Sequence, residues 1–497
     1  MQDYRPDENT PWYSYRDSIS NVVIEDGVNH IGDFAFSQFR GLNSVTIPNK
    51  VTTIGKFAFW ACRGLTSVTI PNSLTIIESF TFAGCDLTEI NIPNSVTTIS
   101  NNAFYTCRGL TTVYIPNSVN SIGVQAFDNC SGLTEITIPN SVTIIEKFAF
   151  SGCRGLTSLT IPNSVAVIDT GTFSYCSGLI SITIPNSVTT IGDWAFAGCS
   201  GLPSLTIPNS VTTIGVCAFT GCEGLTSLTI PYSVTAIGVL AFADCSSLSS
   251  VTLPNSLTTI GDGAFSKCNM LSEFNIDADN TEFALIDGIM FNKDKTTLVI
   301  CPSGMKLNRY NIPLSVTTIG NYAFSDCSDL INVNIPNSVT TIGSYAFADC
   351  RGLTSINIPN SVTTIGDRAF SVCRGLTSFA IPNSVTKIED GTFYSCHNLT
   401  SITIPNSIIS IGVGAFSDCI GLASINIPNS VTKIGDFAFF ECYNLTEIIN
   451  HASIPQTIHA SVFNKVNQNA CMLHVPAASI SAYQASDVWK EFKISSL

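Results

Sequence analysis

The chain has 497 residues, of which 45% are hydrophobic and only 12% are charged. Its net charge of −14 disfavours binding to nucleic acid or to anionic lipid, because both are negatively charged themselves. No apolar run approaches the roughly 18 to 20 residues that a spanning helix needs, so we expect no membrane insertion. No secretory signal is recognised at the N-terminus, which fits either an intracellular chain or a mature segment whose leader has been removed.

The first predicted element is an N-terminal cap over residues 1–20, which contains Trp12, Tyr13 and Tyr15. The first coil of a stacked array exposes an apolar edge that aromatic side chains can cover. A platform for a ligand is the alternative function of these aromatic residues.

A repeat of about 23 residues fills residues 21–276 and 311–450, and residues 184–206 show it most clearly. That copy reads I-P-N-S-V-T-T-I-G-D-W-A-F-A-G-C-S-G-L-P-S-L-T. A phenylalanine anchor recurs in seventeen copies: Phe36, Phe59, Phe82, Phe104, Phe127, Phe150, Phe173, Phe196, Phe219, Phe242, Phe265, Phe324, Phe347, Phe370, Phe393, Phe416 and Phe439. A fixed period of this length indicates one elongated solenoid rather than several globular domains.

Each repeat predicts one coil of the solenoid. The segment Leu65–Ile70 has the pattern L-x-x-V-x-I and predicts a parallel strand, which Pro71 ends because it lacks an N–H group. V-T-T-I-G predicts a second short extended piece, and A-F-x-x-C predicts one helical turn with phenylalanine and cysteine on the same face. The glycine of R-G-L, such as Gly64, is predicted to adopt a left-handed conformation.

The predicted fold class is therefore a right-handed, curved leucine-rich repeat solenoid. Parallel β-strands are expected on the concave face, with short extended pieces and helical turns on the convex side. The valine, isoleucine, phenylalanine, cysteine and leucine anchors of each repeat are expected to point inward.

Sixteen of the 19 cysteines occupy one column, three residues after the phenylalanine anchor. Phe39 and Val466 fill the same column in other copies, so the site accepts small or apolar residues and we expect buried free thiols. Disulfides between neighbouring coils are disfavoured because the cysteine side chains point in parallel directions. Metal binding is disfavoured because the column contains neither histidine nor a C-x-x-C spacing. Cys217, Cys301 and Cys471 lie outside the column and carry no pairing prediction.

An insertion over residues 277–310 interrupts the repeats, and its alternating apolar residues around N-K-D-K predict a β-hairpin. Asp277, Asp279, Asp287 and Asp294 suggest calcium, but their spacing fits no EF-hand loop, so turn formation is the preferred interpretation. Residues 451–497 are predicted to form a decayed repeat and a C-terminal cap over the last coil.

The pattern predicts no enzymatic activity, because five histidines share no column and no catalytic, metal or nucleotide motif is present. No cofactor is expected. The candidate ligand-binding residues are the exposed arginines that directly follow the cysteine column, namely Arg63, Arg108, Arg154, Arg351 and Arg374, with Arg40 at the start of the line. A second line of acidic residues follows Ile-Gly: Asp33, Asp193, Asp262, Asp367, Asp390 and Asp436. Solubility and weak pairing between coils are the alternative roles of both lines.

The consensus I-P-x-S-V-T-x-I-G-x-x-A-F-x-x-C-x-x-L-x-x-I resembles the BspA-like, or Treponema-type, leucine-rich repeat over about 430 of the 497 residues. The resemblance implies a non-enzymatic cell-surface or secreted binding protein of adhesin type. Its expected partners are host extracellular-matrix proteins such as fibronectin and fibrinogen, or other cell-surface proteins, bound through the concave face by a monomer. The alternative is an intracellular protein-interaction scaffold.

Overall fold

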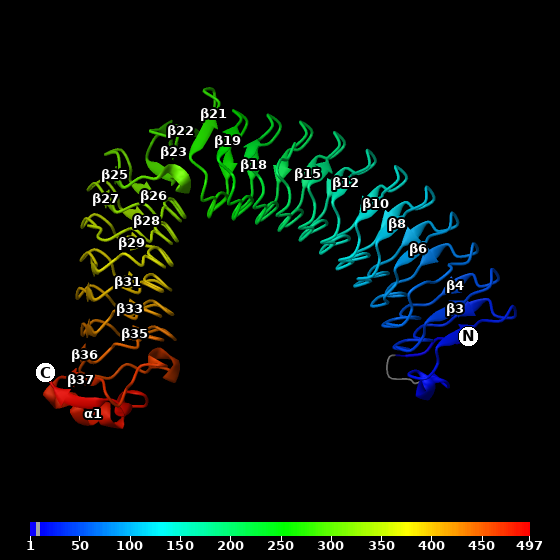
Figure 1. Cartoon of the computed structure of the whole chain (residues 1–497). Helices are drawn as coiled ribbons and strands as arrows, with labels where there is room; N and C mark the ends of the chain where they lie inside the picture. The colour runs from blue at the N-terminus through cyan, green and yellow to red at the C-terminus, as the bar shows by residue number, and fades with distance from the viewer. Residues whose placement is uncertain (6–9) are drawn as a thin grey trace. The chain divides into compact units, whose positions relative to one another are not determined.

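The computed structural model describes residues 1–5 and 10–497, which form two compact units, Met1–Cys268 and Asn269–Leu497. Residues 6–9, which belong to the expected N-terminal cap, lie outside the described residues. In both units short coils stack on one another in chain order, as Figure 1 shows. Among the described residues, no helix has the length and apolar character that crossing a membrane requires.

Most coils of the first unit contribute to two rows of strands. The row that we call the strand face contains β1 (Asn21–Val23), β3 (Ser44–Thr46), β6 (Glu89–Asn91), β8 (Thr112–Tyr114), β10 (Glu135–Thr137), β12 (Ser158–Thr160), β14 (Ser181–Thr183), β17 (Ser227–Thr229) and β19 (Ser250–Leu253). The second row contains β2 (His30–Ile31), β4 (Thr53–Ile54), β5 (Ile76–Ile77), β7 (Thr98–Ile99), β9 (Ser121–Ile122), β11 (Ile144–Ile145), β13 (Val167–Ile168), β15 (Thr190–Ile191), β16 (Thr213–Ile214), β18 (Ala236–Ile237) and β20 (Thr259–Ile260). A 3-10 helix, η1 (Tyr13–Tyr15), precedes them.

The second unit has the same two rows. Its longer strands are β21 (Glu273–Ile276), β25 (Arg309–Asn311), β27 (Asn332–Asn334), β30 (Ser378–Ala380), β32 (Ser401–Thr403), β34 (Ser424–Ile427), β36 (Glu447–Asn450), β37 (Met472–Val475) and β38 (Lys493–Ser496). The short strands are β26 (Thr318–Ile319), β28 (Thr341–Ile342), β29 (Thr364–Ile365), β31 (Lys387–Ile388), β33 (Ser410–Ile411) and β35 (Lys433–Ile434).

Strands of successive coils pair in parallel, as the repeat predicted. In the second row Ile191 lies beside Ile214, which is the residue one repeat later, and on the strand face Leu159 lies beside Ile182. Valine and isoleucine favour this extended, half-buried geometry, and the proline that follows most of the longer strands ends them.

The core of each coil is built from the predicted inward anchors. Phe59, Cys62 and Leu65 are fully buried, and their counterparts along both units are buried as well. The phenylalanine rings stack on one another from coil to coil; those of Phe127 and Phe150, for example, have centroids 5.4 Å apart and lie within 4° of parallel. Such offset stacks add stabilisation to the burial of the rings themselves.

The prediction of a helical turn at A-F-x-x-C was wrong. The segment forms consecutive turns, because Ala61 within it and Phe57 directly before it have positive φ angles of 57° and 58°. In-coil bonds alternate with bonds to the next coil: Cys62 N–H donates to the Phe59 carbonyl at 3.3 Å, whereas Phe59 N–H donates to the Thr81 carbonyl at 3.0 Å. A right-handed helix would direct these N–H groups along its own axis, away from the neighbouring coil.

The left-handed assignment of the R-G-L glycines was also wrong, because the positive-φ positions fall within the consecutive turns instead. These glycines are required for close approach between coils. A Cβ atom on Gly352 would lie 2.4 Å from the Ser328 carbonyl oxygen, and one on Gly375 would lie 2.6 Å from the Arg351 carbonyl oxygen.

The insertion contains the expected hairpin and one further strand. β23 (Ile289–Asn292) and β24 (Thr297–Ile300) are antiparallel, and Asn292 Oδ1 accepts the N–H groups of Thr296 and Thr297 at 2.8 Å each. β22 (Phe283–Ile286) adds to β23 through a turn at Asp287 and Gly288, which have φ angles of 50° and 79°. β24 then pairs in parallel with β26, so the insertion rejoins the second row of the solenoid. η2 (Ser303–Met305) follows.

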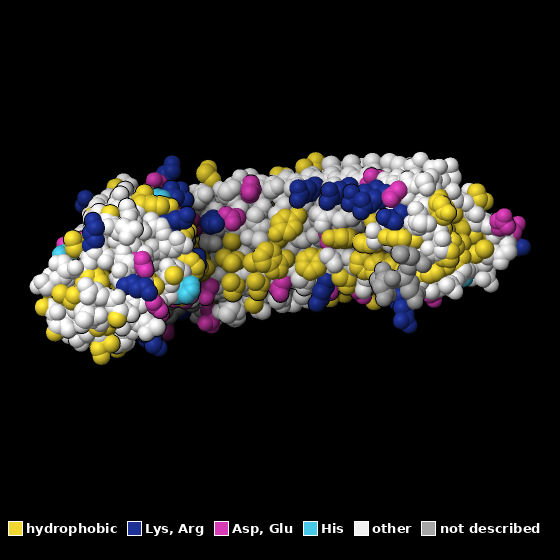
Figure 2. All heavy atoms as spheres, turned by 90° about the horizontal axis from the view of Figure 1, so that it is seen from below, with side chains coloured by type: hydrophobic (Ala, Val, Ile, Leu, Met, Phe, Trp, Pro, Cys, Tyr) yellow, Lys and Arg dark blue, Asp and Glu magenta, His cyan; other side chains and the backbone are white. Residues whose placement is uncertain are grey.

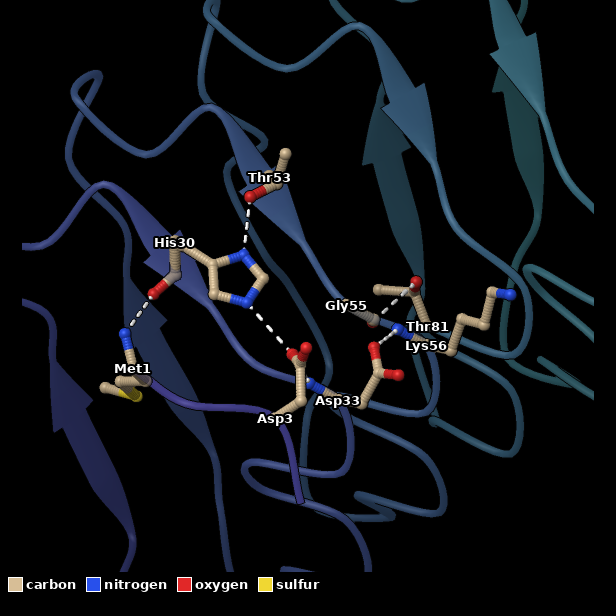
Figure 3. Close-up of polar contacts among 8 residues, drawn as sticks. All are labelled: Met1, Asp3, His30, Asp33, Thr53, Gly55, Lys56 and Thr81. Atoms are coloured by element: carbon tan, nitrogen blue, oxygen red, sulfur yellow. Dashed lines mark hydrogen bonds and ion pairs between the residues drawn. The ribbon is translucent and has the colours of Figure 1, made fainter. Parts of the chain in front are cut away.

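The described N-terminal residues cover the first coil. The Trp12 ring stacks 5.7 Å from Phe36, and its Nε1 donates to the Ala35 carbonyl at 2.8 Å. Figure 3 shows a second anchor, in which Asp3 Oδ1 lies 3.0 Å from both His30 Nε2 and the Asp33 N–H group. The hydrogen bond from the Asp33 N–H group is the main cause that lowers the pKa of Asp3, and the bond with His30 is the second.

The C-terminal residues cover the last coil in a different way. β37 and β38 extend the longer-strand row, and they are accompanied by η3 (Ala460–Phe463), η4 (Ala477–Ser479), α1 (Ile480–Ala485) and η5 (Trp489–Glu491). Trp489 is fully buried, lies edge-on to Phe463 at 5.4 Å and donates its Nε1 hydrogen to the Gln456 carbonyl.

Two phenylalanines on one turn allow the core to be tested. Phe439 is fully buried, whereas Phe437 is 45% exposed. We predict that Phe439→Ala lowers the free energy of unfolding by about 3–5 kcal/mol, because a buried ring is lost and a cavity is left. Phe437→Ala should lower the free energy of unfolding by about 1 kcal/mol or less, because this ring is already exposed. Urea unfolding followed by circular dichroism measures both, and equal losses would contradict this account of the core.

Candidate functional site

The predicted arginine line is exposed on the surface. Each of these arginines follows a buried cysteine and precedes a glycine and a buried leucine, so the backbone on both sides is held by the core while the side chain points outward. All five candidates are exposed: Arg63, Arg108, Arg154, Arg351 and Arg374. Figure 2 shows a row of basic side chains on the face that it draws.

The two units divide the candidates between them. Arg63, Arg108 and Arg154 belong to the first unit, and Arg351 and Arg374 to the second. In the first unit the three arginines are two coils apart from one another, which corresponds to roughly 10 Å at the usual strand spacing. They therefore form a regularly spaced basic row within one unit.

Ion pairing distinguishes one arginine from the others. Arg351 Nη2 lies 2.9 Å from Asp349 Oδ1, and its Nε donates to the same oxygen at 3.1 Å. Within the part of the chain that the structure describes, Arg63, Arg108 and Arg154 have no such carboxylate partner. Their guanidinium groups are thus available to an outside anion.

Several residues of the acidic line have a structural role. Asp33 Oδ1 accepts the N–H group of Lys56 in the next coil at 2.6 Å, which Figure 3 shows. Asp193 accepts from Val216 in the same way at 2.7 Å. These carboxylates bind one coil to the next, which agrees with the alternative interpretation of pairing between coils.

The strand face of the first unit contains a hollow that the sequence analysis did not predict. It has a volume of about 840 Å³ and extends over the four coils of β8, β10, β12 and β14 and the Pro-Asn turns that follow them. No arginine lines it. One irregularity could have pointed to it, since Tyr114 stands where neighbouring coils have threonine or asparagine, and its side chain is 60% exposed.

The cysteine column has no reactive character. All 19 cysteines are free and buried, as predicted for the sixteen in the column. The thiols of the column other than Cys327 donate to the phenylalanine carbonyl of the preceding coil; Cys107 Sγ, for example, lies 3.1 Å from the Phe82 oxygen. Burial raises the pKa of Cys107, Cys176 and Cys222 to about 12, which keeps these thiols protonated and poorly nucleophilic.

The histidines form separate pairs rather than one site. His30 contacts Asp3, His397 Nε2 lies 2.8 Å from Asp418 Oδ2, and His474 Nε2 lies 3.3 Å from Glu447 Oε1. Over residues 1–5 and 10–497, no cluster of three or more histidine, cysteine, aspartate or glutamate side chains has a metal-binding arrangement.

Stacked coils of this length, with parallel strands and a repeated leucine and phenylalanine core, define a leucine-rich repeat protein. A family model described as the BspA type leucine rich repeat region matches residues 11–74, 52–180, 168–285, 301–397 and 386–483. The chain belongs to this family, which confirms the resemblance recognised in its consensus.

Several solved structures are similar to this chain, and the one with a TM-score above 0.5 supports the same fold. The pneumococcal vaccine antigen PcpA is 23% identical with a TM-score of 0.51, over 82% of this chain and 93% of that one. A leucine-rich repeat protein from Bacteroides ovatus is 24% identical with a TM-score of 0.44, over 96% and 92%. A leucine rich cell surface protein from Faecalibacterium prausnitzii is 30% identical with a TM-score of 0.40, over 84% and 87%. No curated protein matches the chain.

The buried thiols predict sensitivity to alkali. Since burial raises the pKa of Cys107, Cys176 and Cys222 from 9.0 to about 12, their stabilising contribution is complete below pH 9 and is lost as the pH rises toward 12. At pH 10 each thiol should lower the free energy of unfolding by about 1.4 kcal/mol. Urea unfolding at pH 7.5 and pH 10 under reducing conditions measures this loss.

The triple variant Cys107→Ser, Cys176→Ser, Cys222→Ser is the control for other alkaline titrations. Between pH 7.5 and pH 10 its free energy of unfolding should fall by about 4 kcal/mol less than that of the parent chain, because serine does not titrate in this range. An identical loss in both proteins would show that these thiols do not control alkaline stability.

Proposed function

We propose that this chain is a non-enzymatic extracellular binding protein that holds a protein partner against the strand face and the basic row Arg63, Arg108 and Arg154 of its first unit. The observation that carries the proposal is the basic row itself. These three guanidinium groups are exposed and lack an ion-pair partner in the described part of a chain whose net charge is −14.

The arrangement favours recognition of a folded protein surface. Arginine is enriched at interfaces because its planar, weakly hydrated group forms bidentate bonds with carboxylates. Beside the row, the outward column of the strands is almost uncharged and consists mainly of threonine and asparagine. A partner with acidic groups at the matching spacing of two coils would therefore gain specificity from the row and shape complementarity from the strands.

The repeat also argues against catalysis. An active site needs different polar groups that converge on one reacting atom, whereas a repeat places the same group along a line. The extracellular setting is proposed because the chain belongs to the BspA-type family, and the resemblance to BspA-like repeats implies a surface adhesin. Fractionation of the native cells tests the setting: protein confined to the cytoplasm would favour the intracellular scaffold instead.

The basic row leads to a binding prediction. Against immobilised extracellular-matrix proteins, including fibronectin and fibrinogen, the chain should bind at least one partner with an affinity that falls as salt rises. The triple variant Arg63→Ser, Arg108→Ser, Arg154→Ser should bind that partner at least tenfold more weakly, since each exposed charge pair with the partner contributes up to about 1 kcal/mol to the binding free energy. Its melting temperature should be unchanged.

A variant of equal charge is the matched control. Lys50, Lys56 and Lys147 are also exposed in the first unit but lie outside the row. Changing these three lysines to serine shifts the net charge from −14 to −17, as the arginine variant does, because both remove three positive charges. If the two variants weaken binding equally, general charge and not the row explains the attraction.

A further inference from the structure

The hollow on the strand face has a chemistry of its own, separate from the basic row. It is lined by the outward residues of β8, β10, β12 and β14, by isoleucine and proline at its base, and by one asparagine per coil. The asparagines are Asn117, Asn140, Asn163 and Asn186. Its lining therefore combines an apolar base with a repeated amide.

The polar groups of the hollow are largely unused by the protein. Thr134, which lies outside it, donates its hydroxyl to the Thr111 carbonyl of the preceding coil at 3.1 Å. The hydroxyls of Thr137, Thr160 and Thr183 have no such intramolecular bond among the described residues. These hydroxyls can both donate and accept hydrogen bonds.

The asparagine row offers donors beside these hydroxyls. Asn140 Oδ1 accepts the Asn163 N–H group at 3.2 Å, which orients the amide and leaves its Nδ2 hydrogens for a ligand. The side chains of Asn117 and Asn186 make no hydrogen bond within the described part of the chain.

The hollow is nearly uncharged. Glu135 is the one carboxylate in its lining, and neither lysine nor arginine is present. A charged ligand would find no repeated counter-charge here, so the lining favours a neutral molecule that carries many hydroxyl groups.

An aromatic side chain lies at one end of the four coils. Tyr114, 60% exposed, comes from the first of them and is the one aromatic residue in the lining. A second hollow on the same face, of about 390 Å³, likewise includes a single exposed aromatic, Tyr232. A ring that is apolar on its face and polar at its hydroxyl suits the C–H face of a sugar.

An extended peptide fits this site less well. Peptides that add to a sheet use free backbone groups at its edge. Here β8 pairs with β10 and β12 pairs with β14, and β10 lies beside β12 although these two are not paired as strands, so the hollow lies over the faces of neighbouring strands. The available groups are side chains, which do not reproduce a strand edge.

We infer that the hollow between Tyr114 and Asn186 is a binding site for a neutral oligosaccharide, with Tyr114 packing against one sugar ring and the Thr137, Thr160 and asparagine side chains binding its hydroxyls. Adjacent coils spaced roughly 4.8 Å apart present these groups at regular intervals along the chain of the sugar. The site does not depend on the proposed protein partner, because no arginine lines it.

The test is calorimetric titration of the full chain with three uncharged probes: maltohexaose, cellohexaose and hexa-N-acetylchitohexaose. At least one should bind saturably, and salt should leave its affinity unchanged. Tyr114→Ala should weaken binding roughly tenfold, as should Thr137→Val combined with Thr160→Val, which removes two hydroxyls at nearly constant volume.

Tyr175→Ala is the matched control, because Tyr175 is 53% exposed in the same unit but does not line the hollow. It should bind the sugar like the parent chain, and so should the arginine-to-serine variant. Absence of binding to all three probes, or equal binding by Tyr114→Ala and the parent, would overturn the inference. Binding of an uncharged Ser/Gly-rich peptide instead, lost in Tyr114→Ala, would assign the hollow to a protein segment.

Discussion

The contact between one coil and the next is the interaction on which the rest of the structure depends. Alternate N–H groups of the turn segment donate to carbonyls of the following coil, the phenylalanine rings stack along the array, and buried thiols donate to carbonyls of the preceding coil. A single coil would leave all of these groups without partners. Buried polar groups are costly when unpaired, so each coil must keep its donors and acceptors in register with those of the next coil.

This constraint separates the interior from the surface. Positions that face the next coil are nearly invariant along the chain, and even the glycines of R-G-L are fixed by a carbonyl of the preceding coil, as Gly375 is by that of Arg351. The outward positions carry no such requirement. The basic row and the tyrosine of the strand-face hollow are departures from the repeat at outward positions, where a departure leaves the stack intact.

The two surfaces use different physical means of recognition. The basic row presents separated charges that attract acidic groups over a distance and respond to salt. The hollow presents short-range hydrogen-bonding groups and an aromatic face, which act only on contact. One scaffold can therefore carry two different means of recognition in one unit, as is usual for solenoids, whose function resides in particular surface residues and not in the fold.

The sequence by itself determined the solenoid, its parallel strands and its buried phenylalanine and cysteine columns, because each of these follows from a side-chain pattern that repeats along the chain. It did not determine the conformation of the A-F-x-x-C segment. Phe59 and Cys62 share a side of the coil both in a helical turn and in consecutive turns, and only the next coil's carbonyls decide where the intervening N–H groups bond. The hollow was likewise a property of the tertiary structure. Tyr114 and Asn186 are 72 residues apart in the sequence, and only the stacking of the coils brings them to one surface.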